Sequence, residues 1–176
     1  MIAGLMLAVA LNCGKTATQV DLDFCAQAEQ QRADRDERLA YAQTPAVAAR
    51  TETLWRRERA ATCEYYYQSA IGGSMAPMLY SQCLANSARG RIRDLAGLRR
   101  GFVFPGAKRA IAEHRRVYGL LELQLSPRER DLLAASENAW LRYSEALCGS
   151  NAACLGEVAA TRTEELKDSW LADPFW

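Results

Sequence analysis

The chain has 176 residues, of which 49% are hydrophobic and 24% are charged, and these values exclude a disordered or collagen-like protein. The net charge of +1 gives no reason to expect nucleic-acid binding. Six cysteines and a single histidine argue against a metal enzyme built on Cys/His clusters, and no cofactor is expected. The charge is uneven, because residues 44–101 are basic and residues 126–176 are acidic. We interpret this asymmetry as solvated helix faces, with steering of a charged partner as the alternative.

The chain opens with an apolar run over residues 2–11. The run is too short to cross a bilayer, which takes about 20 residues, but it has the length of a secretory-signal core. Residues 1–12 are therefore predicted to be a signal-like segment, although no basic residue precedes the run. A buried helix or a misplaced start is the alternative. Cys13 after the run suggests a lipoprotein cleavage site, but Asn12 stands where a small residue is usual. We expect a periplasmic or secreted protein without a spanning segment, and a lipid anchor is the less favoured alternative.

Helix signals dominate the rest of the chain. Thr44 before Pro45 predicts a capped helix start, and Ser126 with Glu129 forms a capping box around Pro127. The residues after this box repeat at three- and four-residue steps along one helical face. These are Leu132, Leu133, Ser136, Ala139, Trp140, Tyr143 and Leu147. Glycine-containing breaks over 72–74, 101–106 and 149–151 separate the helices. No stretch alternates with period two, so the sequence predicts an all-α protein of about five or six helices.

The chain also contains an internal repeat. Trp55 and Cys63 recur as Trp140 and Cys148 at an offset of 85 residues. A further cysteine follows each break, and the matches then resume. They are Cys83 with Cys154, Leu84 with Leu155, Ala88 with Ala159, Arg91 with Arg162 and Leu95 with Leu166. The pattern predicts a disulfide-stapled helical bundle built from two related helical hairpins, each with a cysteine on either side of its turn.

The predicted organisation has four parts. A signal-like segment over 1–12 is followed by a helical unit over 13–100. Residues 101–125 form a connector and a linking helix, and residues 126–176 form a second, degenerate hairpin.

The six cysteines suit three disulfides, and no pair has the spacing of a redox or zinc motif. Sequence alone allows many connectivities, but the repeat selects one. It pairs Cys63 with Cys83 and Cys148 with Cys154, which leaves Cys13 for Cys25. Three disulfides imply an oxidising compartment.

Two stretches of the chain resemble a known family. The first is the cysteine loop from Cys13 to Cys25, followed by a helix with Asp36 and Tyr41. The second sets Trp55, Arg59 and Cys63 at four-residue steps and continues through the glycine break to Cys83, Arg91 and Leu95. Together they cover residues 13–98 and resemble the LprI-like lysozyme-inhibitor family of bacterial envelope and secreted proteins. The resemblance implies an all-helical disulfide-bonded fold, and inhibition of lysozyme by at least some members.

This resemblance has two departures. Arg35-Asp36 stands where the family has Leu-Asp. The C-terminal copy keeps Trp140 and Cys148, but it has Ser144 where an arginine is expected.

The first hairpin offers candidate partner-binding residues. Trp55 and Arg59 share one helical stripe, which suits either a binding patch or, as we favour, a core tryptophan with a locally paired arginine. Tyr65, Tyr66 and Tyr67 cannot all face inward on a helix, so at least one is expected to be exposed. An exposed tyrosine could be a contact site, but we favour partial burial. The loop over 68–78, which includes Ser74, either enters a cleft of the partner or is a plain hairpin loop.

The second hairpin offers an acidic alternative. Its carboxylates could steer and hold a cationic enzyme. They are Glu157, Glu164, Glu165 and Asp168.

No catalytic residue is expected. Glu58 and Glu64 should point in different directions and form surface ion pairs, and the single histidine, His114, is predicted to lie on a helix surface. Nucleophile-elbow and phosphate-loop motifs are missing from the sequence.

A basic run either forms a solvated face, as we favour, or binds a polyanion. It comprises Arg89, Arg91, Arg93, Arg99 and Arg100. Trp170, Phe175 and Trp176 either pack on the bundle or form an exposed anchor.

The sequence therefore predicts a non-catalytic extracytoplasmic protein that binds lysozyme and occludes its cleft. The main alternative is an envelope structural or adaptor module with no lysozyme target. A third is an enzyme of unrecognised type. The oligomeric state stays open.

Overall fold

A computed structural model describes Cys13 and residues 18–171 of the chain. The predicted signal-like segment and the terminal Phe175 and Trp176 lie outside the described residues, as do the side chains of Asp168 and Trp170. The described part contains six helices and no strand, which confirms the all-α prediction. The helices are α1 (Gln19–Ala42), α2 (Pro45–Ser69), α3 (Ala76–Arg100), α4 (Ala107–Gln124), α5 (Pro127–Cys148) and α6 (Ala152–Leu171). None of these six helices is long and apolar enough to cross a membrane.

Local capping explains where several helices begin. The predicted box at α5 is confirmed, since the Ser126 amide donates to Glu129 at 2.9 Å and the Ser126 hydroxyl accepts from the Glu129 amide. Thr18 and Asp21 form a second box at the start of α1. Thr44 and Pro45 mark the start of α2 as predicted, but the Thr44 hydroxyl does not cap the helix, because it donates to the Ala40 carbonyl at 3.2 Å. The turn between α1 and α2 is so short that this hydroxyl stays within reach of the last turn of α1.

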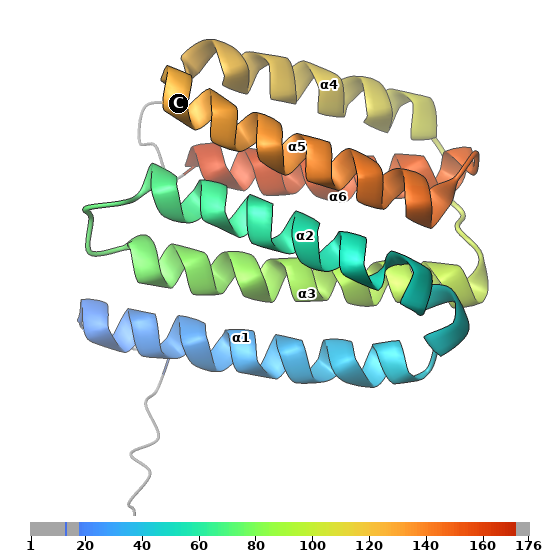
Figure 1. The fold of residues 1–176 in the computed structure, drawn as a ribbon, viewed down its shortest axis with the longest axis horizontal. Helices are drawn as coiled ribbons and strands as arrows, with labels where there is room; N and C mark the ends of the chain where they lie inside the picture. Colours follow the sequence, from blue (N-terminus) through green and yellow to red (C-terminus); the bar gives the residue numbers. More distant parts are fainter. Residues whose placement is uncertain (1–12, 14–17, 172–176) are drawn as a thin grey trace, which may run out of the picture.

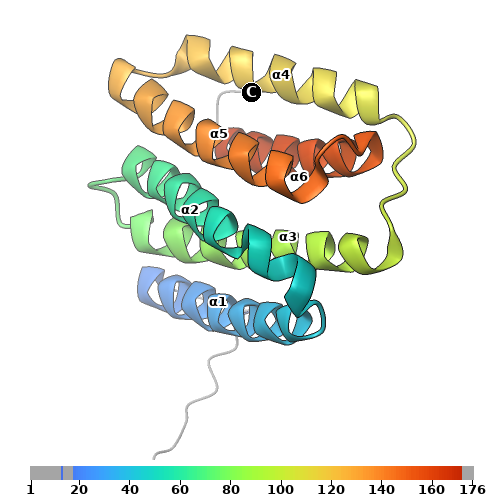
Figure 2. The same ribbon diagram turned by 45° about the vertical axis from the view of Figure 1, so that its right-hand side comes forward.

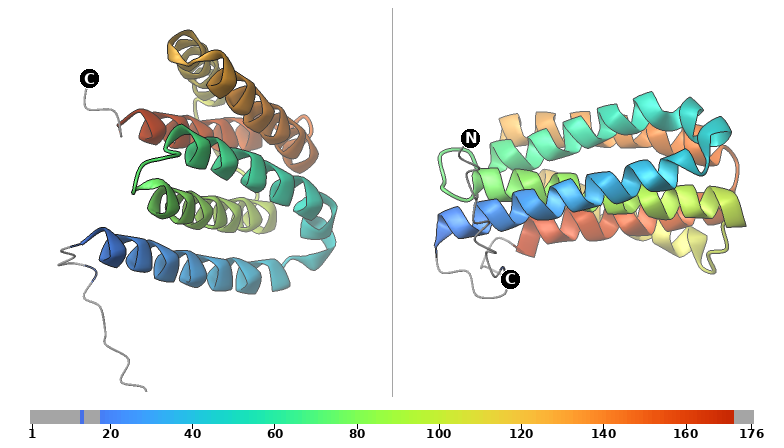
Figure 3. Two further views of the ribbon diagram at one scale, coloured as in Figure 1. Left: turned by 60° about the vertical axis from the view of Figure 1, so that its left-hand side comes forward. Right: turned by 90° about the horizontal axis from the view of Figure 1, so that it is seen from below.

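The six helices form two units of three. In the first unit α1 packs on α3, and in the second unit α4 packs on α6 in the same way. The hairpins α2–α3 and α5–α6 meet mainly through α2 and α5, which lie side by side in Figures 1 and 2. As a result α1 and α4 lie at opposite edges of the molecule (Figures 1 and 3). The helix that the sequence suggested as a link thus has a packing role that matches that of α1.

The sequences of α1 and α4 also match, at an offset of 77 residues. Asp36-Glu37-Arg38 corresponds to Glu113-His114-Arg115, and Tyr41 corresponds to Tyr118. Glu37 and His114 are both buried. This short match was missed in the sequence, and it extends the similarity of the two hairpins to the helix that precedes each of them.

All three predicted disulfides are present. Cys63–Cys83 joins α2 to α3, and Cys148–Cys154 joins α5 to α6 across the shorter turn. Cys13–Cys25 links the N-terminal segment to α1, and the described part has no free cysteine. Such a set fits an oxidising, extracytoplasmic compartment.

The hydrophobic core draws on both units. One cluster groups Trp55 from α2 with Trp140 and Tyr143 from α5, and a second groups Tyr65 with residues of α4, α5 and α6. Residues at matching positions of the two hairpins are equally buried. Ala88 and Ala159 are each 1% exposed or less, and Leu95 and Leu166 are fully buried. Equal burial at matching positions supports the predicted relation between the two hairpins.

Candidate functional site

Two arginines lie at the centre of the molecule, where α2, α3, α5 and α6 meet. Arg91 and Arg162 are each only 1% exposed, so the prediction that Arg91 belongs to a solvated basic face is wrong. Arg91 donates to the Thr51 hydroxyl at 2.9 Å and lies 3.6 Å from the Glu52 carboxylate. Burial is possible because α2 supplies these partners, which replace the water that the guanidinium loses.

Arg162 has the equivalent partners in the second unit. It donates to the Ser136 hydroxyl at 2.5 Å and lies 3.7 Å from Glu137. Ser136 and Glu137 stand 85 residues after Thr51 and Glu52, which is the offset of the repeat. Each unit therefore neutralises its buried arginine with the same hydroxyl and carboxylate positions.

Each arginine also reaches into the other unit. Arg91 donates to the Tyr143 hydroxyl at 2.8 Å, and Arg162 lies 3.9 Å from the Glu58 carboxylate. Glu58 and Tyr143 are again 85 residues apart. The prediction that Glu58 forms a surface ion pair is wrong, since it is 6% exposed, because α2 is covered on this side by the second unit. Glu64, which is exposed, accepts from Gln68 at 2.7 Å rather than pairing with an arginine.

Desolvation raises the pKa values of two carboxyl groups in this polar core. Desolvation, with the nearby charge of Glu165, raises the pKa of Glu58 to about 7, although Arg162 and the Thr62 hydroxyl act in the opposite direction. Desolvation also raises the pKa of Asp94 to about 7, against the hydrogen bond that it accepts from Tyr143 at 2.5 Å. Both groups therefore change charge near neutral pH.

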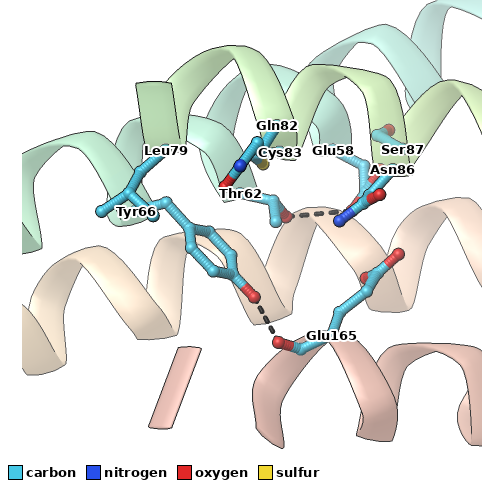
Figure 4. Close-up of a pocket in the computed structure, with 9 residues that line it drawn as sticks. All are labelled: Glu58, Thr62, Tyr66, Leu79, Gln82, Cys83, Asn86, Ser87 and Glu165. Atoms are coloured by element: carbon cyan, nitrogen blue, oxygen red, sulfur yellow. Dashed lines mark hydrogen bonds between the residues drawn. The ribbon is translucent and has the colours of Figure 1, made fainter. Parts of the chain in front are cut away.

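A small polar pocket opens beside this core, between α2, α3 and α6 (Figure 4). Glu58 accepts from the Thr62 hydroxyl at 2.9 Å, and the Tyr66 hydroxyl donates to the backbone carbonyl of Glu165. The pocket has a volume of about 90 Å³, which is space for a few water molecules and far less than the roughly 300–1,000 Å³ of ordinary ligand sites. This pocket therefore suits bound water better than a sugar unit.

The predicted stripe of Trp55 and Arg59 is a structural contact. Trp55 is 4% exposed, and the guanidinium groups of Arg59 and Arg91 lie 5.4 and 5.6 Å from its ring centroid. Arg59 donates to Asp34 at 2.5 Å and to the Leu84 carbonyl at 3.0 Å. The favoured interpretation, a core tryptophan beside a locally paired arginine, is confirmed.

The three tyrosines before the first turn are buried or half-buried. Tyr65 is 3% exposed, and Tyr66 and Tyr67 are half-buried, so the favoured interpretation, partial burial, is confirmed. The ring of Tyr67 contacts Tyr80 edge to face, with centroids 5.8 Å apart. Neighbouring helices cover α2 on several sides, which leaves Tyr66 and Tyr67 half-buried.

The turn between α2 and α3 presents exposed apolar side chains. Ser74 is exposed there, and Ile71 and Met75 are 54% and 47% exposed. The start of α1 lies at the same end of the molecule (Figure 1), where Val20 and Phe24 are 76% and 51% exposed. We call Val20, Phe24, Ile71 and Met75 the loop-end surface.

Two of the four acidic residues proposed in the second hairpin lie beside a cation. Glu164 lies 3.3 Å from Lys167, and Glu165 lies 3.4 Å from the buried Arg162. Glu157 is half-buried, and the side chain of Asp168 lies outside the described part. Glu164 and Glu165 therefore already have a cationic neighbour.

The prediction that His114 lies on the surface is wrong. The ring is 4% exposed, because this face of α4 turns inward. Its Nε2 lies 2.8 Å from Glu137 and its ring centroid 4.5 Å from that of Trp140. No group of residues in the described ranges could hold a metal ion.

The rest of the basic run behaves as a solvated face. Arg89 pairs with Glu29 of α1, and Arg93, Arg99 and Arg100 are exposed.

Comparisons with known proteins agree with the motifs of the first unit. The family model described as lysozyme inhibitor LprI matches residues 12–95. A relative from Rhizobium meliloti (strain 1021), named uncharacterized protein R02472, is 32% identical over 108 residues, which cover 49% of this chain and 78% of the relative. No solved structure matches the chain. From the match of its first unit and the coverage of this relative, the chain belongs to the LprI lysozyme-inhibitor family.

Proposed function

We propose that this protein binds a lysozyme in the periplasm or outside the cell and inhibits it by occluding the substrate cleft. The observation that carries the proposal is membership of a family named for lysozyme inhibition, matched over the first unit. Occlusion needs a rigid surface and no chemistry on the inhibitor's side. The Cys63–Cys83 disulfide and the buried arginines support such rigidity, which lowers the entropy lost on binding.

The loop-end surface is the docking site that we favour. Ile71 and Met75 are exposed in a turn whose two helices are joined by Cys63–Cys83, and Val20 and Phe24 are exposed at the start of α1, at the same end of the molecule. Exposed apolar and aromatic side chains are typical of the centre of a protein interface. A projecting, clamped turn has the shape needed to enter a cleft. The acidic hairpin is the weaker candidate, because Glu164 and Glu165 already have cationic partners.

The test is a bacterial-cell lysis assay in which oxidised protein is titrated against several lysozyme types. We expect stoichiometric inhibition of at least one type. Ile71→Asp combined with Met75→Asp should weaken inhibition at least ten-fold, because charged groups would replace the apolar contacts. Val103→Asp is the matched control, since Val103 is 84% exposed in the connector, at the opposite end of the molecule in Figure 1.

Two results would reject parts of this proposal. Full activity of every lysozyme at a large molar excess of inhibitor would reject inhibition and leave an envelope structural or adaptor role. An association rate that falls steeply with salt, together with full inhibition by the double variant, would move the contact to the acidic hairpin.

A further inference from the structure

The second unit contains a large cavity. The cavity lies between α4 and α5 with α6 as its floor, and its volume is about 600 Å³. This volume falls within the range of roughly 300–1,000 Å³ that is typical of small-molecule sites. Most of its wall is apolar, from Ile111, Tyr118, Trp140, Leu141, Leu155 and Ala159. We call this cavity the α4–α5 groove.

The matching space in the first unit is bridged by a side chain. Arg59 of α2 reaches Asp34 of α1 at 2.5 Å and the Leu84 carbonyl of α3 at 3.0 Å, so it ties the three helices together. In the second unit Ser144 stands at the position of Arg59, and Ile111 stands at that of Asp34. The Ser144 hydroxyl donates to the Leu141 carbonyl of its own helix at 3.0 Å and reaches no other helix. The replacement of a long bridging pair by a short serine and an isoleucine accounts for the open, apolar groove.

The polar groups of the groove favour an anion. The Glu137 carboxylate is already paired, with His114 at 2.8 Å and with Arg162 at 3.7 Å. Nδ1 of the buried His114 has no hydrogen-bond partner among the described residues. Arg115 lines the groove, is exposed, and forms no ion pair within the described part of the chain. The groove thus combines an apolar wall with an unpaired cation at its mouth.

We propose that the α4–α5 groove binds an amphipathic carboxylate of the fatty-acid type. The hydrocarbon chain lies along Trp140, Leu141 and Leu155, and the carboxylate meets Arg115. A hydrocarbon chain suits this wall because burial of methylene groups drives binding without directional partners. An anionic head suits Arg115 because the guanidinium donates to carboxylates in a bidentate geometry. This site lies in the second unit, away from the loop-end surface, so it does not depend on the proposed lysozyme inhibition.

The test uses the full, oxidised protein and titration calorimetry with dodecanoate, followed in parallel by tryptophan fluorescence. We expect saturable binding of one dodecanoate per chain. Butanoate, with the same head and a short tail, and dodecyltrimethylammonium, with a long tail and a cationic head, should each bind at least ten-fold more weakly. Arg115→Glu should weaken dodecanoate binding at least five-fold, whereas Arg109→Glu, an exposed change on α4 outside the groove, should leave it unchanged.

A variant whose side chains fill the groove tests the proposal more directly. Ile111→Asp with Ser144→Arg restores the residues that bridge the first unit and should abolish dodecanoate binding. Should that double variant fail to fold, Leu141→Asp serves instead, because Leu141 is already 49% exposed and a carboxylate there repels the ligand. Folding of each variant is checked by circular dichroism.

Three results would overturn the proposal. The first is the absence of saturable dodecanoate binding by the folded wild-type protein. The second is unchanged binding by folded variants of the groove. The third is a dimer in solution that Leu141→Asp converts to a monomer, which would assign the groove to a second copy of the chain.

Discussion

The Arg91 guanidinium and the Tyr143 hydroxyl form a 2.8 Å hydrogen bond that joins the two units of the molecule. The same hydroxyl donates to Asp94 at 2.5 Å, so Tyr143 bridges a buried cation and a half-buried acid. Tyr143 is 3% exposed, and water cannot replace it without a rearrangement of the core. This single hydroxyl therefore satisfies two charged groups of α3 from a helix of the other unit.

Tyr143→Phe is expected to lower the free energy of unfolding by about 1–3 kcal/mol, because both partners lose a hydrogen bond in a buried place. Denaturation in guanidinium chloride measures the change. Tyr80→Phe is the control, since Tyr80 is 37% exposed, and its effect should stay within about 0.5 kcal/mol. Equal stability of wild type and Tyr143→Phe would contradict a bridging role for the hydroxyl.

Two carboxyl groups of the polar core, Glu58 and Asp94, make stability depend on pH. The pKa of Glu58 rises from 4.5 to about 7 on folding, and that of Asp94 rises from 3.8 to about 7. Between the ordinary and the raised values the folded state holds protons that the unfolded state has released. The contribution of these two groups to stability is therefore fully present at low pH and is lost as pH rises toward and through 7.

Paired variants isolate this effect. Glu58→Gln and Asp94→Asn should each flatten the fall in urea midpoint between pH 5 and pH 8, because an amide does not titrate. Asp131→Asn, which alters an exposed carboxylate on α5, should leave that fall unchanged. If wild type and the two amide variants lose stability in parallel over this range, other groups govern the pH dependence.

The two hairpin disulfides should differ in their effect on stability. Cys63 and Cys83 are 20 residues apart, whereas Cys148 and Cys154 are 6 apart. Chain-entropy estimates give about 3 kcal/mol for the longer loop and about 2 kcal/mol for the shorter one. Replacement of each pair by alanine, with guanidinium denaturation of the two variants, tests this order. The reverse order would show that the shorter bridge does more than restrict the unfolded chain.

Gly156 allows α6 to approach α4 closely. A Cβ atom at this position would lie 2.5 Å from Cα of Ala107, so Gly156→Ala should lower stability by about 1–3 kcal/mol. Gly119 in α4 is the matched control, because a Cβ there meets nothing within 4 Å. Gly119→Ala should raise stability by about 0.5–1 kcal/mol through the better helix propensity of alanine. Thermal unfolding of both variants distinguishes the two effects, and stabilisation by Gly156→Ala would contradict the close approach.

Local signals were sufficient to predict much of the fold. The Ser126 capping box, the glycine breaks and the cysteine positions depend on neighbouring residues, and their helices and disulfides were predicted correctly. The burial of Arg91, Glu58 and His114 was not predicted, because it depends on helices that are distant in the sequence. A helix pattern shows that a polar residue lies on a polar face, but it does not show which other helix covers that face.

One sequence signal could have revealed the buried arginines. Thr51 and Glu52 recur as Ser136 and Glu137 at the offset already found for the tryptophans. A hydroxyl and an acid that recur together with an arginine indicate a shared polar contact rather than two independent solvated faces. The α4–α5 groove was beyond such reasoning, because the match between α1 and α4 that identifies Ile111 as the partner of Asp34 became clear only from their equivalent packing.

Arg59 bridges three helices of the first unit, whereas Ser144 stands at the equivalent position of the second unit. In a symmetric assembly of two identical chains, a substitution that removes the arginine would remove it from both halves at once. In this molecule the two units are different stretches of one chain, so the first can carry the bridging Arg59 while the second carries Ser144 in its place. Because both units belong to one polypeptide, a bridged unit and an open unit can coexist in the same molecule.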